Sequence, residues 1–208
     1  MKKLLLTLLL AVPFLAQAAT DDSKYLKGAV PEENGIVTFR QTFAVTGKQQ
    51  ADIFATMKAY AKQLVDGSIP NSLRARVVSE DAATGEIVMR AEEYMVFKRK
   101  PLYLDRAYFR YTLSITCTPD GKVQLKLSQI SYGYDEDCEG NTSTTLKAEE
   151  WITDSQAINK AGTKLFPRSG KFRRKTVDRV EEIFLQARQA FEEPEQPAPK
   201  KPAATVVQ

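Results

Sequence analysis

The chain has 208 residues, with 30 Lys and Arg against 26 Asp and Glu, and it contains no histidine. The absence of histidine excludes Ser-His-Asp and Cys-His catalysis and every zinc site with an imidazole ligand. Two cysteines are too few for an all-cysteine zinc site. A nucleic-acid-binding domain is usually basic over a whole face, which this charge balance does not suggest. We therefore expect no metal, no cofactor and no nucleic-acid partner.

The first 18 residues, MKKLLLTLLLAVPFLAQA, have the three parts of a cleavable signal peptide. Lys2 and Lys3 make its positive start, an apolar run follows, and Ala16-Gln17-Ala18 is a small-residue cleavage site. The apolar run is shorter than the ~20 residues of a membrane-spanning helix, and no cysteine follows it to carry a lipid. We expect a periplasmic or secreted mature chain without stable membrane insertion. A retained anchor helix is the alternative.

Residues 19–34 are a lead-in to a single domain, which covers residues 35–192. The segment Gly35–Val45 alternates well enough to predict a strand. From Gln49 to Val65 the apolar residues move to helical spacing, which predicts a helix.

Two short strands are then predicted, Arg74–Ser79 and Glu86–Ala91, joined by a loop that contains Gly85. The segment Tyr94–Leu104 is harder to assign, because Pro101 interrupts it and proline is rare inside sheets.

The strongest local pattern is a long hairpin around Pro119-Asp120-Gly121. Pairing across this turn sets three apolar pairs on one face of the hairpin: Cys117 with Val123, Ile115 with Leu125, and Leu113 with Leu127. The other face is polar. We therefore expect an antiparallel sheet that is covered on one face only.

Two cysteines in an exported protein can form a disulfide, because the compartments outside the cytoplasm are oxidising. Here Cys117 lies beside the turn, whereas Cys138 lies beyond the far end of the second hairpin strand. An extended strand covers ~3.3 Å per residue, so the hairpin itself argues against this bridge. We expect two free thiols, and a Cys117–Cys138 disulfide is the alternative.

Residues 135–169 are expected to form a polar loop and a short helix around Asp154–Ala161. A final helix is predicted over residues 172–192, because apolar residues recur there at spacings of three and four. Residues 193–208 are rich in Pro, Ala and Lys, and we expect a disordered tail. The result is an α+β domain with helices on one face of an antiparallel sheet, in the order β-α-β-β-β-β-α.

This order resembles a family of exported bacterial proteins known only as a domain of unknown function with a TATA-binding-protein-like fold. The residues that carry the resemblance are PDGKVQLKLSQISY, Pro119–Tyr132, and GKFRRKTVDRVEEIF, Gly170–Phe184. The resemblance implies the architecture and no activity. Since the same fold can serve many functions, it does not imply DNA binding either.

The segment Phe166–Arg179 carries six cations against one acid, Asp178. Five of the six are candidates for an anion site: Arg168, Lys171, Arg173, Arg174 and Lys175. The last three are expected at or just before the N-terminus of the final helix, where free N–H groups attract anions and cations oppose the helix dipole. We expect these cations to pair with the protein's own acids or to be solvated, and an external anion is the alternative. The acids considered as partners are residues 135–139, Glu149, Glu150 and Glu182.

Three weaker candidates remain. Tyr132, Tyr134 and Trp151 are candidates for an aromatic ligand surface. Asp135, Asp137 and Glu139 are spaced as calcium ligands can be, but they lack the full loop pattern, so we predict no metal site. Glu92-Glu93 and Glu149-Glu150 are the candidate acid pairs for glycoside hydrolysis, although neighbours on a strand point to opposite faces.

Two functions follow as hypotheses. The leading one is an exported, non-catalytic domain that binds a ligand, polymer or protein partner at the cell envelope. The alternative is a glycan-directed hydrolase that uses two carboxylates, which must lie roughly 5–10 Å apart.

Overall fold

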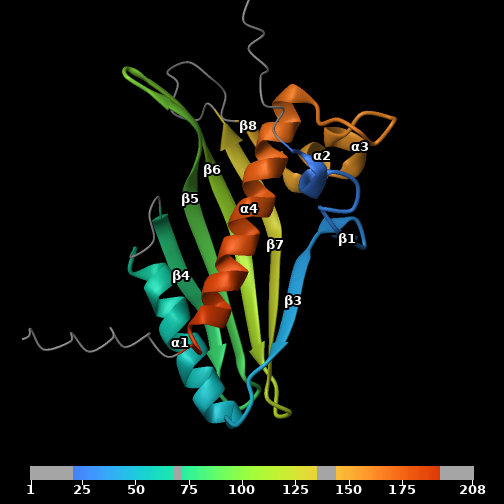
Figure 1. Cartoon of the computed structure of the whole chain (residues 1–208). Helices are drawn as coiled ribbons and strands as arrows, with labels where there is room; N and C mark the ends of the chain where they lie inside the picture. Colours follow the sequence, from blue (N-terminus) through green and yellow to red (C-terminus); the bar gives the residue numbers. More distant parts are fainter. Residues whose placement is uncertain (1–20, 68–71, 135–143, 193–208) are drawn as a thin grey trace, which may run out of the picture.

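A computed structural model describes residues 21–67, 72–134 and 144–192 of the chain. It contains a six-stranded antiparallel sheet with two long helices, α1 and α4, on one of its faces (Figure 1). The predicted signal peptide, the tail, the polar loop with its calcium candidates, and Cys138 lie outside the described residues. The α+β prediction is confirmed.

The strands of the sheet follow the order β3-β7-β6-β5-β4, and β8 pairs with β7 beyond the end of β3. Their bounds are Phe39–Ala44 for β3, Ser72–Asp81 for β4, Glu86–Lys100 for β5, Tyr103–Cys117 for β6, Lys122–Tyr134 for β7 and Thr144–Lys147 for β8. The expected order of elements is present. The structure adds the small β1–β2 hairpin (Glu32–Glu33 and Ile36–Val37), the 3-10 turn η1 (Ser23–Tyr25), β8 and the one-turn helix α2 (Ala148–Trp151). The predicted short helix is present as α3 (Asp154–Ala157).

The β6–β7 hairpin has the predicted register. Cys117 pairs with Val123, Ile115 with Leu125 and Leu113 with Leu127, and all six side chains are buried. At Gln129 the backbone φ is 53°, and the register shifts by one residue there. This bulge places both Leu127 and Ile130 in the core although they are three residues apart.

Strand β5 is much longer than the segment Glu86–Ala91 predicted for it, because it continues through Tyr94 to Lys100. Pro101 lies in the turn to β6 and not inside a strand, which resolves the ambiguous segment. Since β4 stops at Ser72, opposite Glu93, the far half of the β5–β6 hairpin projects from the body as an arm (Figure 1).

Helix α1, Gln50–Val65, lies where it was predicted and buries the expected stripe of apolar residues. Helix α4, Pro167–Gln189, begins earlier than predicted, since Pro167 occupies its first turn after an extended Phe166. Gly170 lies inside this helix, and a Cβ atom there would be 2.8 Å from the Cβ of Leu165. The absence of a side chain at Gly170 thus allows close packing of α4 against Leu165.

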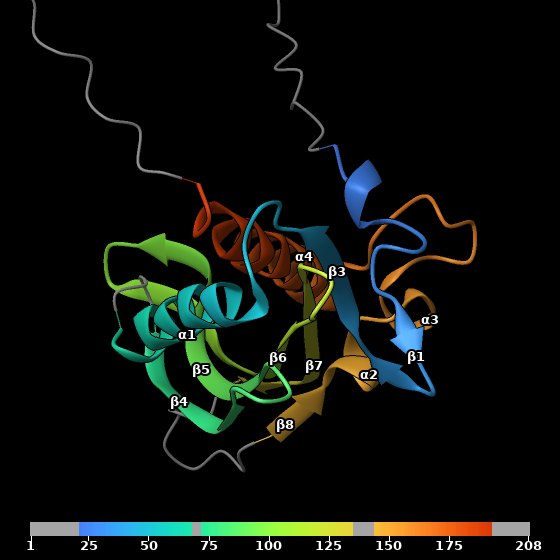
Figure 2. The same ribbon diagram turned by 90° about the horizontal axis from the view of Figure 1, so that it is seen from below.

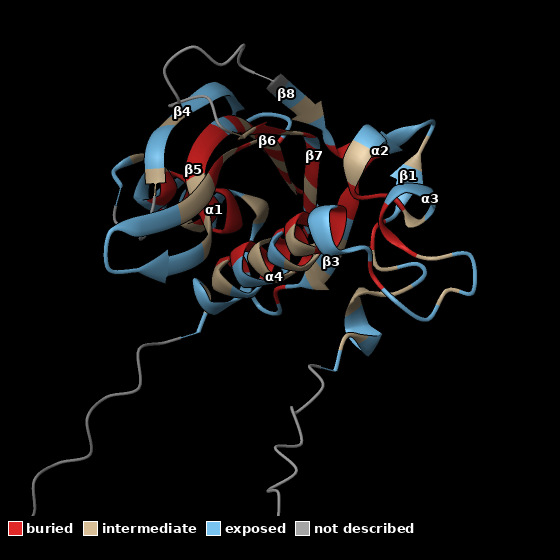
Figure 3. Ribbon diagram, turned by 90° about the horizontal axis from the view of Figure 1, so that it is seen from above, coloured by how far each residue is buried: buried red, intermediate tan, exposed pale blue. Residues whose placement is uncertain are grey.

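Both long helices pack on the same face of the sheet and bury its apolar side chains (Figures 2 and 3). Within this layer the Tyr60 hydroxyl of α1 donates a hydrogen bond of 2.8 Å to the Ile183 carbonyl of α4. The predicted short helix over Asp154–Ala161 is only one turn long, because Ile158 leaves it to bridge Leu165. No helix among the described residues is both long and apolar enough to cross a membrane.

Candidate functional site

Arg173, one of the predicted anion ligands, is fully buried in the second turn of α4. Its guanidinium donates to the carbonyls of Tyr25 at 2.5 Å, Leu26 at 2.7 Å and Ile152 at 2.6 Å, and to Asp154 Oδ1 at 2.6 Å. These bonds tie the lead-in and the short helices to α4. The side chain is not available to an external anion.

Arg174 and Lys171 also pair with the protein's own acids. Arg174 Nε donates to Asp22 Oδ1 at 2.6 Å, and this bond holds the pKa of Asp22 below its usual range. Lys171 Nζ lies 2.9 Å from Asp105 Oδ2 and 2.9 Å from the Tyr134 hydroxyl. These are internal ion pairs, but the acids differ from those considered in the sequence.

Arg168 and Lys175 are exposed and form no ion pair within the described part of the chain. Of the five candidates only Arg168 lies in the first turn of α4, because the helix begins at Pro167. The expectation that Arg173, Arg174 and Lys175 cluster at the helix N-terminus is wrong for this reason. Of the acids proposed as partners, Glu182 contacts a cation of this segment, Arg179 Nη1, at 2.9 Å.

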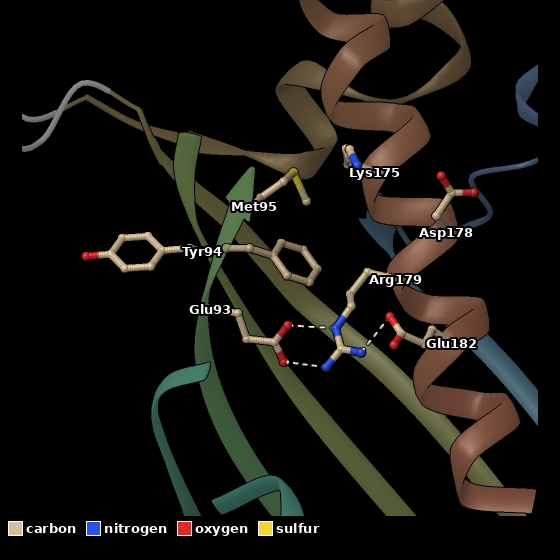
Figure 4. A pocket seen from close by; sticks show the side chains of 8 residues that line it. Glu93, Tyr94, Met95, Lys175, Asp178, Arg179 and Glu182 are labelled. Carbon is tan, nitrogen blue, oxygen red and sulfur yellow. Dashed lines mark hydrogen bonds and ion pairs between the residues drawn. The ribbon is translucent and has the colours of Figure 1, made fainter. Parts of the chain in front are cut away.

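Glu93 of β5 and Arg179 of α4 form a buried ion pair between sheet and helix (Figure 4). Arg179 Nε donates to Glu93 Oε2 at 2.7 Å and its Nη2 to Oε1 at 2.9 Å, while the Tyr111 hydroxyl donates to Oε1 at 2.6 Å. Burial is the main reason that the pKa of Tyr111 lies well above its ordinary value, and the Glu93 charge adds to it. The pair closes one side of a pocket of about 210 Å³.

This pocket is not suited to two-carboxylate hydrolysis. Figure 4 shows Glu93 and Glu182 on opposite sides of the Arg179 guanidinium, which contacts both carboxylates. Hydrolysis needs the substrate bond between the two carboxylates, and here the Arg179 guanidinium occupies that space. The arrangement instead joins α4 to the sheet.

Glu92 lies on the other face of the sheet, as alternation along a strand requires. Its carboxylate accepts from Arg74 Nη2 at 2.8 Å and Arg110 Nε at 2.6 Å. Burial alone would raise the pKa of Glu92, but the hydrogen bonds from the two arginines outweigh it and hold the pKa below its usual range. In the second acid pair, Glu149 accepts from the Val37 amide at 2.8 Å and Glu150 is exposed.

The three aromatic candidates do not form a ligand surface. Tyr132 is fully buried, and its hydroxyl shares a 2.7 Å hydrogen bond with Thr176. Tyr134 and Trp151 pack edge-on against Phe172, a core residue, with centroid distances of 5.5 and 6.0 Å. The prediction is wrong for Tyr132, because β7 turns that side chain toward the helices.

The side of the sheet away from α1 and α4 (Figure 2), which we call the open face, carries charged and aromatic side chains of β4, β5 and β6. Cross-strand pairing arranges these side chains in rows. The open face includes Arg74, Arg76, Arg90, Glu92, Tyr94, Arg106, Tyr108, Arg110 and Thr112.

Two neighbouring rows concentrate positive charge. In one row Arg74 and Arg110 both contact Glu92. In the next row Arg76 lies directly opposite Arg90, and neither has an ion-pair partner among the described residues. Like charges directly opposite each other destabilise a sheet. These rows line a groove of about 890 Å³, which also reaches Thr112 and Gln129.

A third row is aromatic. Tyr94 and Tyr108 are cross-strand partners whose ring centroids are 5.3 Å apart. The Arg106 guanidinium lies 3.9 Å from the Tyr94 centroid, and that of Arg110 lies 5.3 Å from the Tyr108 centroid. The open face thus combines arginines with stacked tyrosines.

Sequence reasoning missed the open face because its cations are dispersed over three strands. One pattern in the sequence could have indicated this face. Arg74 and Arg76 are two residues apart, as are Arg90 and Glu92, and this spacing places each pair on one face of a strand. Among the described residues there is no group of three or more acidic or cysteine side chains that could hold a metal ion.

Comparison with known proteins identifies the family that has this architecture. A family model, "Domain of unknown function (DUF4468) with TBP-like fold", matches residues 39–133. A solved DUF4468 family protein from Bacteroides ovatus is 39% identical, with a TM-score of 0.74, and the match covers 86% of this chain and 100% of that one.

A TBP-like protein from Parabacteroides distasonis shares the fold at 22% identity and a TM-score of 0.63, over 80% of this chain and 99% of that one. No curated protein matches the chain. With 39% identity over the whole of a solved member, and with the family model matching residues 39–133, the chain belongs to the DUF4468 family of TBP-like domains.

Proposed function

We propose that the chain is a non-catalytic binding domain that acts outside the cytoplasm, at the cell envelope, and that its open face binds an anionic polymer. The observation that carries the proposal is that Arg76 and Arg90 lie directly opposite each other and that neither has an ion-pair partner in the described part of the chain. A sheet that needed only stability would place an acid or a neutral residue opposite an arginine. A bound anion supplies the missing negative charge.

The chemistry of the face narrows the ligand class. Guanidinium groups bind carboxylate, sulfate and phosphate through paired N–H donors, which favours ligands with planar or tetrahedral anionic groups. The four arginines of the two basic rows line one groove, so a ligand with repeated charges can engage several of them. Tyr94 and Tyr108 extend the face with rings that sugar units commonly contact. An acidic polysaccharide suits this combination.

The location rests on the 18-residue leader, which has the pattern of a cleavable signal peptide. Two observations argue against the hydrolase hypothesis. Glu92 and Glu93 lie on opposite faces of the sheet, and Arg179 contacts both Glu93 and Glu182.

The test is calorimetric titration of the mature chain with heparin, a sulfated polysaccharide, and with polygalacturonate, a carboxylated one. Replacing Arg76 and Arg90 with Gln should weaken binding at least about tenfold, since charge-assisted hydrogen bonds are lost. The free energy of unfolding should hold or rise, since the repulsion is removed.

The matched control replaces Arg168 and Lys175 with Gln, which removes the same charge from exposed, unpaired side chains elsewhere. Equal weakening by both double variants would mean that only net charge matters, and would refute the open face as the site.

A further inference from the structure

The tip of the β5–β6 arm exposes three consecutive large apolar side chains. Leu102 is 109% exposed relative to a reference residue, Tyr103 is 55% exposed and Leu104 is 42% exposed. Apolar side chains exposed singly are common on protein surfaces, whereas a contiguous group marks an interaction site. The arm extends beyond the other strands, so this group is convex (Figure 1).

Backbone conformation at the tip points the same way. Leu102 has a φ of +62°, in the left-handed region that glycine or asparagine adopts most easily. A leucine there is uncommon, and its full exposure provides no packing to offset the strain. Unfavourable backbone geometry of this kind is retained where the side chain has a use.

Three cations precede the tip directly: Lys98, Arg99 and Lys100. All three are exposed, and none has an ion-pair partner in the described ranges. The nearest acid in β6, Asp105, is already bound by Lys171 and by the Tyr134 hydroxyl. The arm therefore ends in an apolar tip with a net positive collar.

We propose that the β5–β6 arm inserts Leu102, Tyr103 and Leu104 into the interfacial region of an anionic phospholipid bilayer, with Lys98, Arg99 and Lys100 on the headgroups. Apolar side chains that enter the acyl boundary, aromatic rings at headgroup depth and cations on anionic lipid are the three elements of interfacial binding. A convex tip with apolar residues on both faces fits a fluid bilayer better than the flat or grooved surface of a folded partner. The arm surface is separate from the open-face arginines Arg76 and Arg90.

The experiment measures sedimentation of the mature chain with vesicles. We expect it to bind vesicles of phosphatidylcholine with 30–40% phosphatidylglycerol (about the anionic fraction that attracts basic segments) and to bind pure phosphatidylcholine weakly. Replacing Lys98, Arg99 and Lys100 with Gln should lower the partition coefficient by about fivefold per cation. Replacing Leu102 and Leu104 with Ser should abolish insertion at unchanged charge.

A fluorescent reporter distinguishes insertion from adsorption. In a Tyr103→Trp variant, emission should shift to the blue on addition of anionic vesicles and should not respond to soluble glycerol phosphate. All arm variants should melt within about a degree or two of the unmodified chain, because the changed side chains are exposed.

Three results would overturn the proposal: no binding to anionic vesicles, equal binding by the Leu102→Ser/Leu104→Ser variant, or a reporter that responds to glycerol phosphate alone. The Arg76→Gln/Arg90→Gln variant should still bind vesicles. If that variant loses vesicle binding while the arm variants keep it, the open face and not the arm contacts the lipid, and the arm proposal fails.

Discussion

Glu92 and Glu93 are adjacent in β5, yet their carboxylates lie on opposite faces of the sheet. Glu92 binds Arg74 and Arg110 on the open face, whereas Glu93 binds Arg179 and Tyr111 beneath α4. One acid therefore balances part of the surface charge and the other attaches the final helix. This division explains why the pair cannot act together on one substrate.

Reversing Arg173 and Arg174 to Glu should destabilise the fold strongly. The change leaves three carbonyls without their donor and sets like charges beside Asp154 and Asp22. Losing a buried charged partner costs about 3–5 kcal/mol. Denaturant unfolding measures the loss, and Arg168→Glu, at an exposed position, is the control, with an expected change within about 0.5 kcal/mol. A double variant that melts no lower than the unmodified chain would contradict this account.

The Glu93–Arg179 pair should show strong coupling in a double-mutant cycle. Glu93→Leu or Arg179→Met alone leaves the remaining charge buried without its partner, and should lower the free energy of unfolding by about 3–5 kcal/mol. The combined change should lower it by clearly less than the sum of the two single effects. Tyr111→Phe serves as the background, because the tyrosine hydroxyl would otherwise lose its acceptor.

The comparison pair is Lys122 with Asp120, whose side chains are 49% and 58% exposed. Exposed pairs contribute about 0–1 kcal/mol, so neutralising this pair should have little effect. Additive effects of the Glu93 and Arg179 substitutions would show that α4 is not held by this contact.

Stability should fall at alkaline pH. Burial raises the pKa of Tyr60, Tyr111 and Tyr132 above that of an exposed tyrosine. The unfolded chain then loses these protons near pH 10 while the folded chain retains them, so the contribution to stability is present below pH ~10 and declines above it. Each tyrosine can contribute up to ~1.4 kcal/mol per pH unit in that range. Urea titrations from pH 8 to 11 should show a shallower decline for Tyr132→Phe than for the unmodified chain. Identical slopes would rule out a role for this tyrosine.

Cys117 should be unreactive in the folded protein. It is fully buried as a free thiol, and burial raises its pKa to about 11. In a Cys138→Ser variant, a thiol reagent at pH 8 should titrate no thiol in the native state and one after unfolding. In the unmodified chain, unfolding without reductant should release two. Zero thiols there would mean that Cys117 and Cys138 form a disulfide.

The mature chain should begin at Ala19. Intact-mass measurement of the protein from its native host should show the loss of 18 residues. Full-length chain in the membrane fraction would instead identify the leader as a retained anchor.

Local patterns in the sequence determined the class of fold and the register of the β6–β7 hairpin. Alternation along a strand and the spacing of a helix depend on near neighbours, so they can be read residue by residue. The exceptions are also local. The start of α4 was missed because the apolar spacing that predicts the helix does not extend to its first residues, Pro167 to Lys171.

Only the tertiary structure decided which charges meet. Lys171 pairs with Asp105, Arg174 with Asp22 and Arg179 with Glu93, across 66, 152 and 86 residues of sequence. The dense cationic segment is for the most part internally paired, whereas Arg76 and Arg90, on two different strands of the open face, have no ion-pair partner among the described residues. Sequence reports the number of charges and their local spacing, but pairing depends on which strands and helices pack together. For that reason the charged surface that we propose as a binding site could be recognised only in the tertiary structure.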